Sequence, residues 1–358
     1  KPDPSLYAEL KKVSHRDYTT GFYFNKPGGT EQRYGGSSYI REYDMVGVVE
    51  DYDSNTGIAK LIQKNRFFKG DEVEFLCTDG TFFTQEIEYL TDENGEPTTI
   101  PYDRAGYMDI APEDKGENVR REICLTLEQM GIRPECSHHE QGPGQNEIDF
   151  RYAEPVKAAD DAVTFRTVVN TVALRNGLAA DFSPKPLENE SGNGLHINMS
   201  VKCDDGTDRT PAFMAGILAH IRDLTAFLNP SEASYSRFGK CKAPKFVTWS
   251  HENRSQLIRI PAAKGEYRRI ELRSPDPSAN PYLAYALLIW AGLDGIEKDM
   301  CPAPAVNLNL LVAPESETRE FDTLPGSLAE AVSLTSGSAL VRRVLGEDAA
   351  AFLTDARR

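Results

Sequence analysis

The sequence predicts an α+β protein in which a small, barrel-like β domain precedes a larger domain of mixed helices and strands. Two observations carry this prediction. Residues 1–90 hold short β-branched and aromatic runs between Gly and Asp turns, and helical spacing of apolar residues begins only after residue 91. Because 358 residues are enough for two or three domains, we divide the chain into residues 1–90 and residues 91–358.

Hairpins are predicted in the first domain. The apolar runs are residues 45–49, 58–62, 73–76 and 81–83, with turn residues at 53–57 and 78–80. Two such runs joined by a short turn that contains Gly or Asp are typical of a β-hairpin. The first domain is therefore expected to be a small sheet or barrel.

The second domain is predicted to combine helices with extended segments. Helical periodicity marks residues 114–130, 157–176, 211–228 and 281–293, and extended patterns mark residues 145–150, 194–201, 256–260 and 268–273. Gly131 is placed to end the first helix, and Asn280 followed by Pro281 is placed to begin the last.

Charge and apolar content argue against two classes of partner. Forty Lys and Arg against 55 Asp and Glu give a formal net charge of −15, which disfavours binding to nucleic-acid phosphates and anionic lipids. No apolar run approaches the roughly 20 residues that span a bilayer. The six cysteines include no C-x-x-C pair, so we expect reduced thiols and a cytoplasmic location. From the charge and the apolar content we expect no nucleic acid and no membrane as partners.

The densest group of ionisable residues runs from Ser137 to Glu147. Glu140 and Glu147 are seven residues apart, so one straight strand would point them to opposite faces. The Gly-Pro-Gly segment at 142–144 breaks such a strand, and a reversal there would bring both carboxylates together. A solvated acidic turn is an equally good interpretation.

A second polar face is predicted in residues 194–200. Polar and apolar residues alternate there, so His196, Asn198 and Ser200 share one face of a strand. The preceding loop contains Gly192, and its glycines permit close approach of a ligand to the backbone. The alternative is a core histidine with no ligand.

Arginines gather in a third segment. Arg269, Glu271 and Arg273 share one face of a predicted strand, and Arg254 and Arg259 lie shortly before it. These four arginines lie within 20 residues of one another in an acidic chain and indicate an anion site, because guanidinium groups bind phosphate and carboxylate oxygens in pairs. A structural network of ion pairs is the alternative.

These three segments together favour phosphoryl-transfer chemistry. Several carboxylates, one imidazole and no thiolate suit Mg²⁺ or Mn²⁺ better than zinc. Divalent cations beside arginines are typical of phosphoryl transfer. The chain has no G-x-x-x-x-G-K-[ST] motif, so a P-loop enzyme is excluded and another kind of nucleotide site is predicted.

Residues 91–358 resemble the C-terminal catalytic domain of type I glutamine synthetases. Four stretches carry the resemblance: SHHEQGPGQNEIDFRYA, SGNGLHINMS, NRSQLIRIPAA and RRIELRSPDPSANPYLAYALLIWAGLDGIE. The resemblance implies an antiparallel sheet flanked by helices, and ATP-dependent ligation of glutamate and ammonia through a γ-glutamyl phosphate. It also implies Mg²⁺ or Mn²⁺ as cofactor and a homo-oligomer.

The same resemblance implies roles for individual residues. The implied metal ligands are Glu140 and Glu147 on the glutamate side, and His196 and Glu271 on the ATP side. The implied catalytic arginines are Arg254 and Arg269 on the transferred phosphate, and Arg237 and Arg273 on the substrate carboxylates. Gly192 is implied to contact the amino acid, and the nucleotide is expected against Arg259, Arg269, Asn198 and Ser200.

The family also needs an acidic pair on an early strand. Glu86 and Glu88 are the candidates, because period-2 spacing puts both carboxylates on one face, as two adjacent metals require. Glu72 and Glu74 are the second choice. For either pair, a solvated strand face is an equally good explanation.

Residues 1–90 resemble a different family, the C-terminal β domain of collagenase-like peptidases. The segments KVSHRDYTTGFYF, SSYIREYDMVGVVEDYD and KGDEVEFL carry this resemblance. No peptidase residue transfers, and Ser14, His15 and Asp17 are too close in sequence to form a catalytic triad. A module that recruits protein or RNA is a third option for the chain, with RNA disfavoured by the net charge.

The ammonia side of the glutamine synthetase resemblance is altered. Lys242 stands where the family has a glutamate that binds ammonium, and a cation there would repel NH₄⁺. Ser191 replaces an asparagine found in many members, and the family's N-terminal β-grasp domain is expected to be missing. We predict an enzyme of the glutamate–ammonia ligase type, with an activity that these changes would reduce or abolish. The alternatives are a ligase for a larger amine, a non-catalytic nucleotide- or glutamate-binding scaffold, and a recombined chain.

Overall fold

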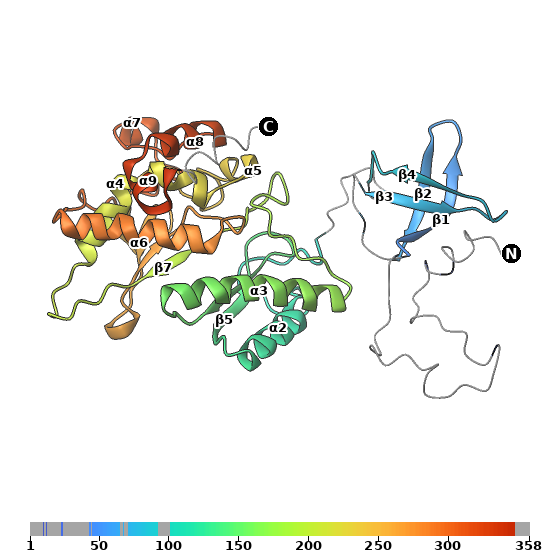
Figure 1. The fold of residues 1–358 in the computed structure, drawn as a ribbon, viewed down its shortest axis with the longest axis horizontal. Helices are drawn as coiled ribbons and strands as arrows, with labels where there is room; N and C mark the ends of the chain where they lie inside the picture. Colours follow the sequence, from blue (N-terminus) through green and yellow to red (C-terminus); the bar gives the residue numbers. More distant parts are fainter. Residues whose placement is uncertain are drawn as a thin grey trace. The chain divides into compact units, whose positions relative to one another are not determined.

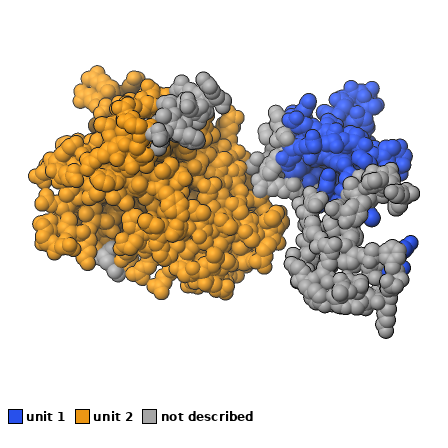
Figure 2. All heavy atoms as spheres, in the orientation of Figure 1, with its two compact units in different colours: residues 1–98 blue, residues 99–358 orange. Residues whose placement is uncertain are grey.

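The computed structural model describes two separate parts of the chain. The described residues are 10, 12, 23, 43, 45–64, 67, 71–91 and 101–347. They fall into unit 1 (Lys1–Thr98) and unit 2 (Thr99–Arg358), which Figure 2 colours separately. The boundary predicted after residue 90 lies inside unit 1. Ser14, His15 and Asp17 lie outside the described residues.

Unit 1 contains the two predicted hairpins. Strand β1 (Gly47–Asp53) pairs with β2 (Ile58–Gln63), and β3 (Glu72–Leu76) pairs with β4 (Phe82–Glu86), both antiparallel. Across the second hairpin, the rings of Phe75 and Phe83 stack with centroids 5.0 Å apart. The described strands of this unit form two separate two-stranded sheets, so closure into a barrel stays a prediction.

Unit 2 holds the helices, and the four predicted helices are confirmed with small shifts at their ends. They are α2 (Glu117–Gln129), α3 (Pro155–Arg175), α4 (Thr210–Leu228) and α6 (Pro281–Glu297). Short helices not predicted are α5 (Glu232–Tyr235), η2 (Gly265–Tyr267), α7 (Glu315–Thr318), α8 (Leu328–Gly337) and α9 (Ala339–Leu345). Among the described residues, no helix is both long and apolar enough to cross a bilayer.

The strands of unit 2 fall into two sheets. They are β5 (Pro134–His139), β6 (Asn146–Phe150), β7 (Ile197–Met199), β8 (Trp249–His251), β9 (Ile258–Ile260) and β10 (Ile270–Leu272). Strands β5 and β6 form a hairpin, and the other four form one sheet in the order β7–β10–β9–β8. The extended segments predicted from sequence are therefore confirmed, each around a shorter strand.

The four-stranded sheet is mixed. Strand β10 is antiparallel to β7 and β9, as expected, but β8 runs parallel to β9. The expectation of an antiparallel sheet is wrong at this edge. Strands β8 and β9 have only three residues each, so the connecting residues 252–257 are enough to carry the chain back along a strand of about 10 Å.

Helices α2 and α6 end or begin at capping residues that can be recognised in the sequence. The Asn280 side chain accepts hydrogen bonds from the backbone N–H groups of Tyr282 and Leu283, and Pro281 occupies the first turn of α6. Gly131, just beyond α2, has a φ of 83°, a left-handed conformation that costs glycine little.

Two hydrophobic cores position the strands of unit 2. The larger core packs α4, α6 and α9 against the four-stranded sheet, with Ile217, Leu287 and Ile270 fully buried. The smaller core packs α2 and α3 against the hairpin, with Leu127 and Val172 buried. Figure 1 shows α2 and α3 beside β5, and α6 alongside β7. Alternate residues of the strands are thereby left free to build a polar site.

Helices α4 and α6 approach closely because glycines meet at their contact. A Cβ on Gly216 would lie 2.2 Å from the backbone oxygen of Ala291, and a Cβ on Gly295 would lie 2.2 Å from that of Ala212. Backbone atoms cannot move aside as the end of a flexible side chain can, so a larger residue here would push the helices apart.

Gly295→Ala is expected to lower the free energy of unfolding of unit 2 by roughly 1–3 kcal/mol, because the added methyl group overlaps backbone atoms. Both tryptophans of the chain, Trp249 and Trp290, lie in unit 2, so tryptophan fluorescence during guanidinium denaturation reports on this unit. Gly337→Ala is the matched control, since nothing lies within 4 Å of its added Cβ. Equal losses in the two variants would contradict the packing argument.

Candidate active site

The β5–β6 hairpin brings together His138, Glu140 and Glu147, which we call the acidic face. His138 lies opposite Glu147 in the hairpin register, and one ligand atom from each of the three side chains lies within 4.8 Å of the others. The reversal predicted at residues 142–144 is present and joins the two strands. It places both carboxylates on one side of the hairpin.

Hydrogen bonds hold this reversal and connect it to the glycine-rich loop. The Glu140 N–H donates to the backbone oxygen of Gln145 at 2.7 Å. The side-chain amide of Gln145 donates to the Gly192 oxygen at 3.0 Å and to the Asn193 side chain at 2.9 Å. Two segments that are far apart in sequence are thereby fixed side by side.

Negative charge accumulates at the acidic face. Burial raises the pKa of Glu147 to about 8, and the carboxylates of Asp149 and Glu140 add to the rise. Burial also raises the pKa of Asp149, although the charge of His138 opposes that rise. Carboxylates that lie this close to one another favour either a bound proton or a bound cation.

The residues present fit a divalent cation. Oxygen ligands from Glu140 and Glu147, with an imidazole from His138, form a donor set that suits Mn²⁺ or Mg²⁺. A cation would also remove the repulsion that keeps a proton on Glu147.

Glu271 lies on β10, in the interior of the four-stranded sheet. It is 4% exposed and accepts hydrogen bonds from Arg259 Nε at 2.5 Å and from Arg273 Nη1 at 2.6 Å. The Nδ1 atom of His196 lies 3.3 Å from its Oε1 atom. The register sets Glu271 directly opposite Asn198 and Arg259. The three predicted strands therefore do bring these side chains together.

His196 is held neutral by its surroundings. Desolvation lowers its pKa well below the usual value, and the charges of Arg273, Arg237 and Arg259 lower it further. A neutral imidazole keeps a lone pair on one ring nitrogen, which a metal ligand requires.

Arg237 lies beside the glycine-rich loop. It is 3% exposed, and its Nη1 atom donates to the Ser274 oxygen at 3.2 Å. A Cβ on Gly192 would lie 2.5 Å from the Pro184 oxygen and 2.8 Å from Arg237 Cγ, so only glycine fits at this position. Burial lowers the pKa of Arg237 to about 10, against the opposing charge of Asp276.

Two buried guanidinium groups of this site, those of Arg237 and Arg273, retain a free donor. Within the part of the chain that the structure describes, the Nε atoms of Arg237 and Arg273 have no hydrogen-bond partner. A buried donor without a partner costs roughly 1–3 kcal/mol, and an anionic ligand would supply the acceptor. Both arginines therefore fit an anion such as a carboxylate.

Tyr107 connects the acidic face to the arginines. Arg254 Nη1 donates to the Tyr107 hydroxyl at 3.1 Å, and the Tyr107 ring meets the His138 ring edge-on with centroids 5.4 Å apart. Lys242 adopts a φ of 69° and sets its Nζ atom 4.6 Å from the Tyr107 ring centroid.

Other predicted residues lie at the margin of this site or in unit 1. Arg269 donates to the Asn198 side chain at 3.0 Å, and Ser200 is exposed just beyond the end of β7. Glu86 and Glu88 are exposed residues of unit 1, and Glu72 lies opposite Glu86 in the β3–β4 register. The part of both acidic pairs in a metal site stays a prediction.

The sequence analysis missed three residues of the site. His138 precedes Glu140 by two positions and Asp149 follows Glu147 by two, so strand alternation alone could have added both. Tyr107 comes from an irregular segment with no periodic signal, and only the tertiary structure brings it to His138.

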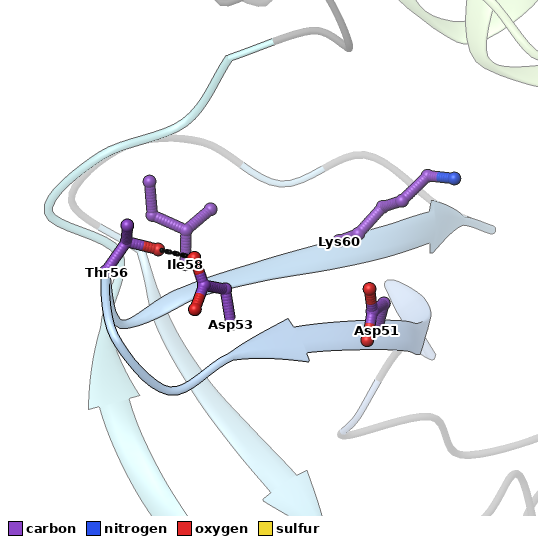
Figure 3. Close-up of a pocket in the computed structure, with 5 residues that line it drawn as sticks. All are labelled: Asp51, Asp53, Thr56, Ile58 and Lys60. Atoms are coloured by element: carbon purple, nitrogen blue, oxygen red, sulfur yellow. Dashed lines mark hydrogen bonds between the residues drawn. The ribbon is translucent and has the colours of Figure 1, made fainter.

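A separate hollow on the β1–β2 hairpin of unit 1 is open to solvent. It is lined by Asp51, Asp53, Thr56, Ile58 and Lys60 (Figure 3). The Thr56 hydroxyl donates to the Asp53 carboxylate at 2.9 Å, which is a bond of the hairpin turn itself. Turn formation explains these polar groups, and we assign the hollow no ligand.

The sequence profile described as "Glutamine synthetase, catalytic domain" matches residues 57–358. The chain belongs to the glutamine synthetase family. The glutamine synthetase of Clostridium saccharobutylicum is 45% identical over 274 residues, which cover 72% of this chain and 62% of the relative. That of Halobacterium salinarum is 38% identical over an alignment that covers 100% of this chain and 78% of the relative. A solved structure described as "GmaS/ADP complex-Conformation 1" matches with a TM-score of 0.65 and 33% identity, over 74% of this chain and 65% of that one.

The glutamine synthetase match confirms the family predicted for the larger domain and extends further along the chain. It begins at residue 57, inside unit 1, whereas the resemblance was expected from residue 91. The likeness of residues 1–90 to collagenase-like peptidases stays a prediction. The chain spans less than two thirds of the Clostridium relative, and the fold of the matched part is that of the catalytic domain, with mixed helices and sheets.

The raised pKa of Glu147 predicts a pH dependence of stability. Its folded-state pKa of about 8 exceeds its unfolded value of 4.5, so the folded state binds the proton more tightly. The stabilisation is fully present below about pH 4.5 and is lost as the pH rises toward 8. Without metal, we expect the free energy of unfolding of unit 2 to fall by roughly 1–2 kcal/mol over this range, less than the full linkage value because 34% of the side chain is exposed.

Tryptophan fluorescence during denaturation at several pH values measures this dependence. Glu147→Gln is expected to flatten the curve, whereas Glu317→Gln, at an exposed position of α7, is expected to leave it unchanged. An unchanged slope in Glu147→Gln would contradict the assignment of the proton to this residue.

Proposed function

We propose that this chain provides the catalytic domain for ATP-dependent ligation of glutamate and ammonia through a γ-glutamyl phosphate. The observation that carries the proposal is the meeting of the acidic face with the arginines around Glu271. Membership of the glutamine synthetase family supports the same reaction. We further propose that the protein acts in the cytoplasm as a homo-oligomer, with ATP and Mg²⁺ or Mn²⁺ as cofactors.

Carboxylates and imidazoles would hold the cations. Glu140 and Glu147 are the proposed ligands of one divalent cation, and His196 and Glu271 of a second, with Glu86 and Glu88 proposed to complete the set. When bound, such cations neutralise phosphate and carboxylate oxygens. Glu271 is engaged by Arg259 and Arg273, so binding of a cation there requires one guanidinium to move toward another anion.

The arginines would bind the anionic substrates. Arg237 and Arg273 offer unpaired Nε donors to the carboxylates of glutamate, beside the backbone of Gly192. Arg254 and Arg269 are proposed to contact the transferred phosphate, where positioning and charge neutralisation supply most of the catalysis.

The nucleotide would lie along β7 and β9. The residues proposed to contact it are Arg259, Arg269, Asn198 and Ser200.

A second candidate function is binding of nucleotide and glutamate without turnover. The position of Lys242 favours it, because its ammonium group faces the Tyr107 ring beside His138. A resident cation there would oppose entry of NH₄⁺. A ligase for a larger amine would also be consistent with this contact.

Formation of γ-glutamyl hydroxamate from glutamate, hydroxylamine and ATP tests the proposed reaction. We expect product that requires ATP and either Mg²⁺ or Mn²⁺. No product from a chain that still binds ATP and Mn²⁺ in calorimetry would support the second candidate. Lys242→Glu is then expected to raise turnover with ammonia if only the ammonium side is at fault.

Arg269→Gln is expected to lower kcat/KM for hydroxamate formation by about 100-fold, the usual loss when a donor to a developing negative charge is removed. Arg268→Gln is the matched control on the neighbouring residue. The guanidinium of Arg268 forms an ion pair with Asp208, at 2.7 Å, and not with a proposed site residue. We expect the control to stay within about twofold of the parent. Similar losses in both variants would argue against a specific role for Arg269.

Binding of Mn²⁺ near pH 7 is expected to release about one proton, because Glu147, with a pKa of about 8, is mostly protonated without metal. Calorimetry in buffers of different ionisation enthalpy measures this release. Glu147→Gln should abolish the release and weaken binding. Full-strength binding to that variant without any change in proton release would remove Glu147 from the proposed ligand set.

A further inference from the structure

A buried pair of side chains, His139 and Asp103, lies next to the acidic face. His139 is 0% exposed and Asp103 is 5% exposed, and the His139 Nε2 atom lies 2.8 Å from Asp103 Oδ1. The pair connects the end of β5 to the irregular segment that precedes α2. Neither residue contributes an atom to the acidic face, so the proposed function gives them no role.

Both ring nitrogens of His139 face atoms that only accept hydrogen bonds. The Nδ1 atom lies 2.6 Å from the backbone oxygen of Glu140, and Nε2 faces the Asp103 carboxylate. His139 is therefore held at both ring nitrogens, by the backbone of the loop on one side and by the segment before α2 on the other.

Asp103 is surrounded by donors, which keeps it ionised. Its Oδ1 atom also accepts from the Gly144 N–H at 3.0 Å, and its Oδ2 atom accepts from the Lys115 N–H at 3.0 Å. Burial alone would raise the pKa of Asp103, but the hydrogen bonds from His139, Lys115 and Gly144 lower it.

The pair grips both ends of the acidic loop. His139 holds the backbone of Glu140 at the start of the loop, and Asp103 holds the backbone of Gly144 at its end. Gly144 has a φ of 63°, and a Cβ there would lie 3.1 Å from the Tyr102 nitrogen, so the loop lies against the same segment. The direction of the Glu140 side chain thus depends on two contacts made by this pair of side chains.

We propose that Asp103 and His139 are positioning residues that fix the loop from Glu140 to Gly144 and hold the Glu140 carboxylate toward Glu147. The proposal deepens the proposed function, since it assumes that Glu140 binds a cation. Groups that orient metal ligands in this way usually change metal affinity 10- to 100-fold when removed.

Titration of the full chain with Mn²⁺, followed by electron paramagnetic resonance, tests the positioning role. Asp103→Asn is expected to weaken Mn²⁺ binding about 10-fold or more. Asp294→Asn is the matched control, because His220 Nε2 also lies 2.8 Å from an aspartate oxygen there, between α4 and α6. The control is expected to lower thermal stability and leave Mn²⁺ affinity within twofold of the parent. Equal Mn²⁺ affinity in Asp103→Asn and the parent, or equal weakening in both variants, would overturn the proposal.

Amide hydrogen exchange in the metal-free chain, followed by nuclear magnetic resonance, tests the loop contacts without any metal. The Gly144 N–H donates to Asp103 at 3.0 Å, so we expect it to exchange slowly in the parent and faster in His139→Gln, where Asp103 loses its partner. A Gly144 N–H that exchanges in the parent as fast as an exposed amide would overturn the proposal, even if Asp103→Asn fails to fold. If the parent does not bind Mn²⁺ but this N–H is protected, the proposed function fails while the loop contacts stand.

Discussion

The site in unit 2 depends on one carboxylate that cannot be left unpaired. Glu271 is buried in the four-stranded sheet between Arg259 and Arg273, with His196 beside it. Removing one partner of a buried ion pair typically costs about 3–5 kcal/mol, so these guanidiniums stay where they are unless another charge replaces Glu271. The carboxylate thus orients the arginines, and desolvation together with the charges of these arginines lowers the pKa of His196. An anionic substrate would therefore meet guanidinium donors that are already oriented by the folded protein.

The hairpin presents the opposite electrostatic situation. Glu140, Glu147 and Asp149 are close together, and the pKa of Glu147 rises because its neighbours are acidic and its surroundings are desolvated. Charge is therefore balanced internally on the sheet and unbalanced on the hairpin. Tyr107 contacts both His138 and Arg254, and Gln145 reaches the Gly192 loop. These contacts hold the hairpin and the four-stranded sheet together. Such a contrast suits a reaction in which cations and anions must be bound side by side.

The family match also covers part of unit 1. The match begins at residue 57, so it includes the β3–β4 hairpin, whose last strand ends at Glu86, and Glu88 two residues further on. Glu72 faces Glu86 across that hairpin, and like charges directly opposite each other destabilise a sheet unless another charge compensates them. One member of each acidic pair, Glu72 and Glu86, therefore lies opposite the other on adjacent strands, whereas Glu88 lies beyond the end of β4.

The sequence by itself determined the helices, the hairpins and the family. Apolar periodicity, the Asn280 cap and the turn at residues 142–144 act locally, so they can be recognised without knowing what packs where. The four stretches that carry the family resemblance also contain most of the charged residues of the site. Only the tertiary structure decided that β8 runs parallel to β9, that Tyr107 reaches His138, and that His139 pairs with Asp103. Those contacts join residues from different segments, and their energies depend on burial and distance, which no local pattern in the sequence specifies.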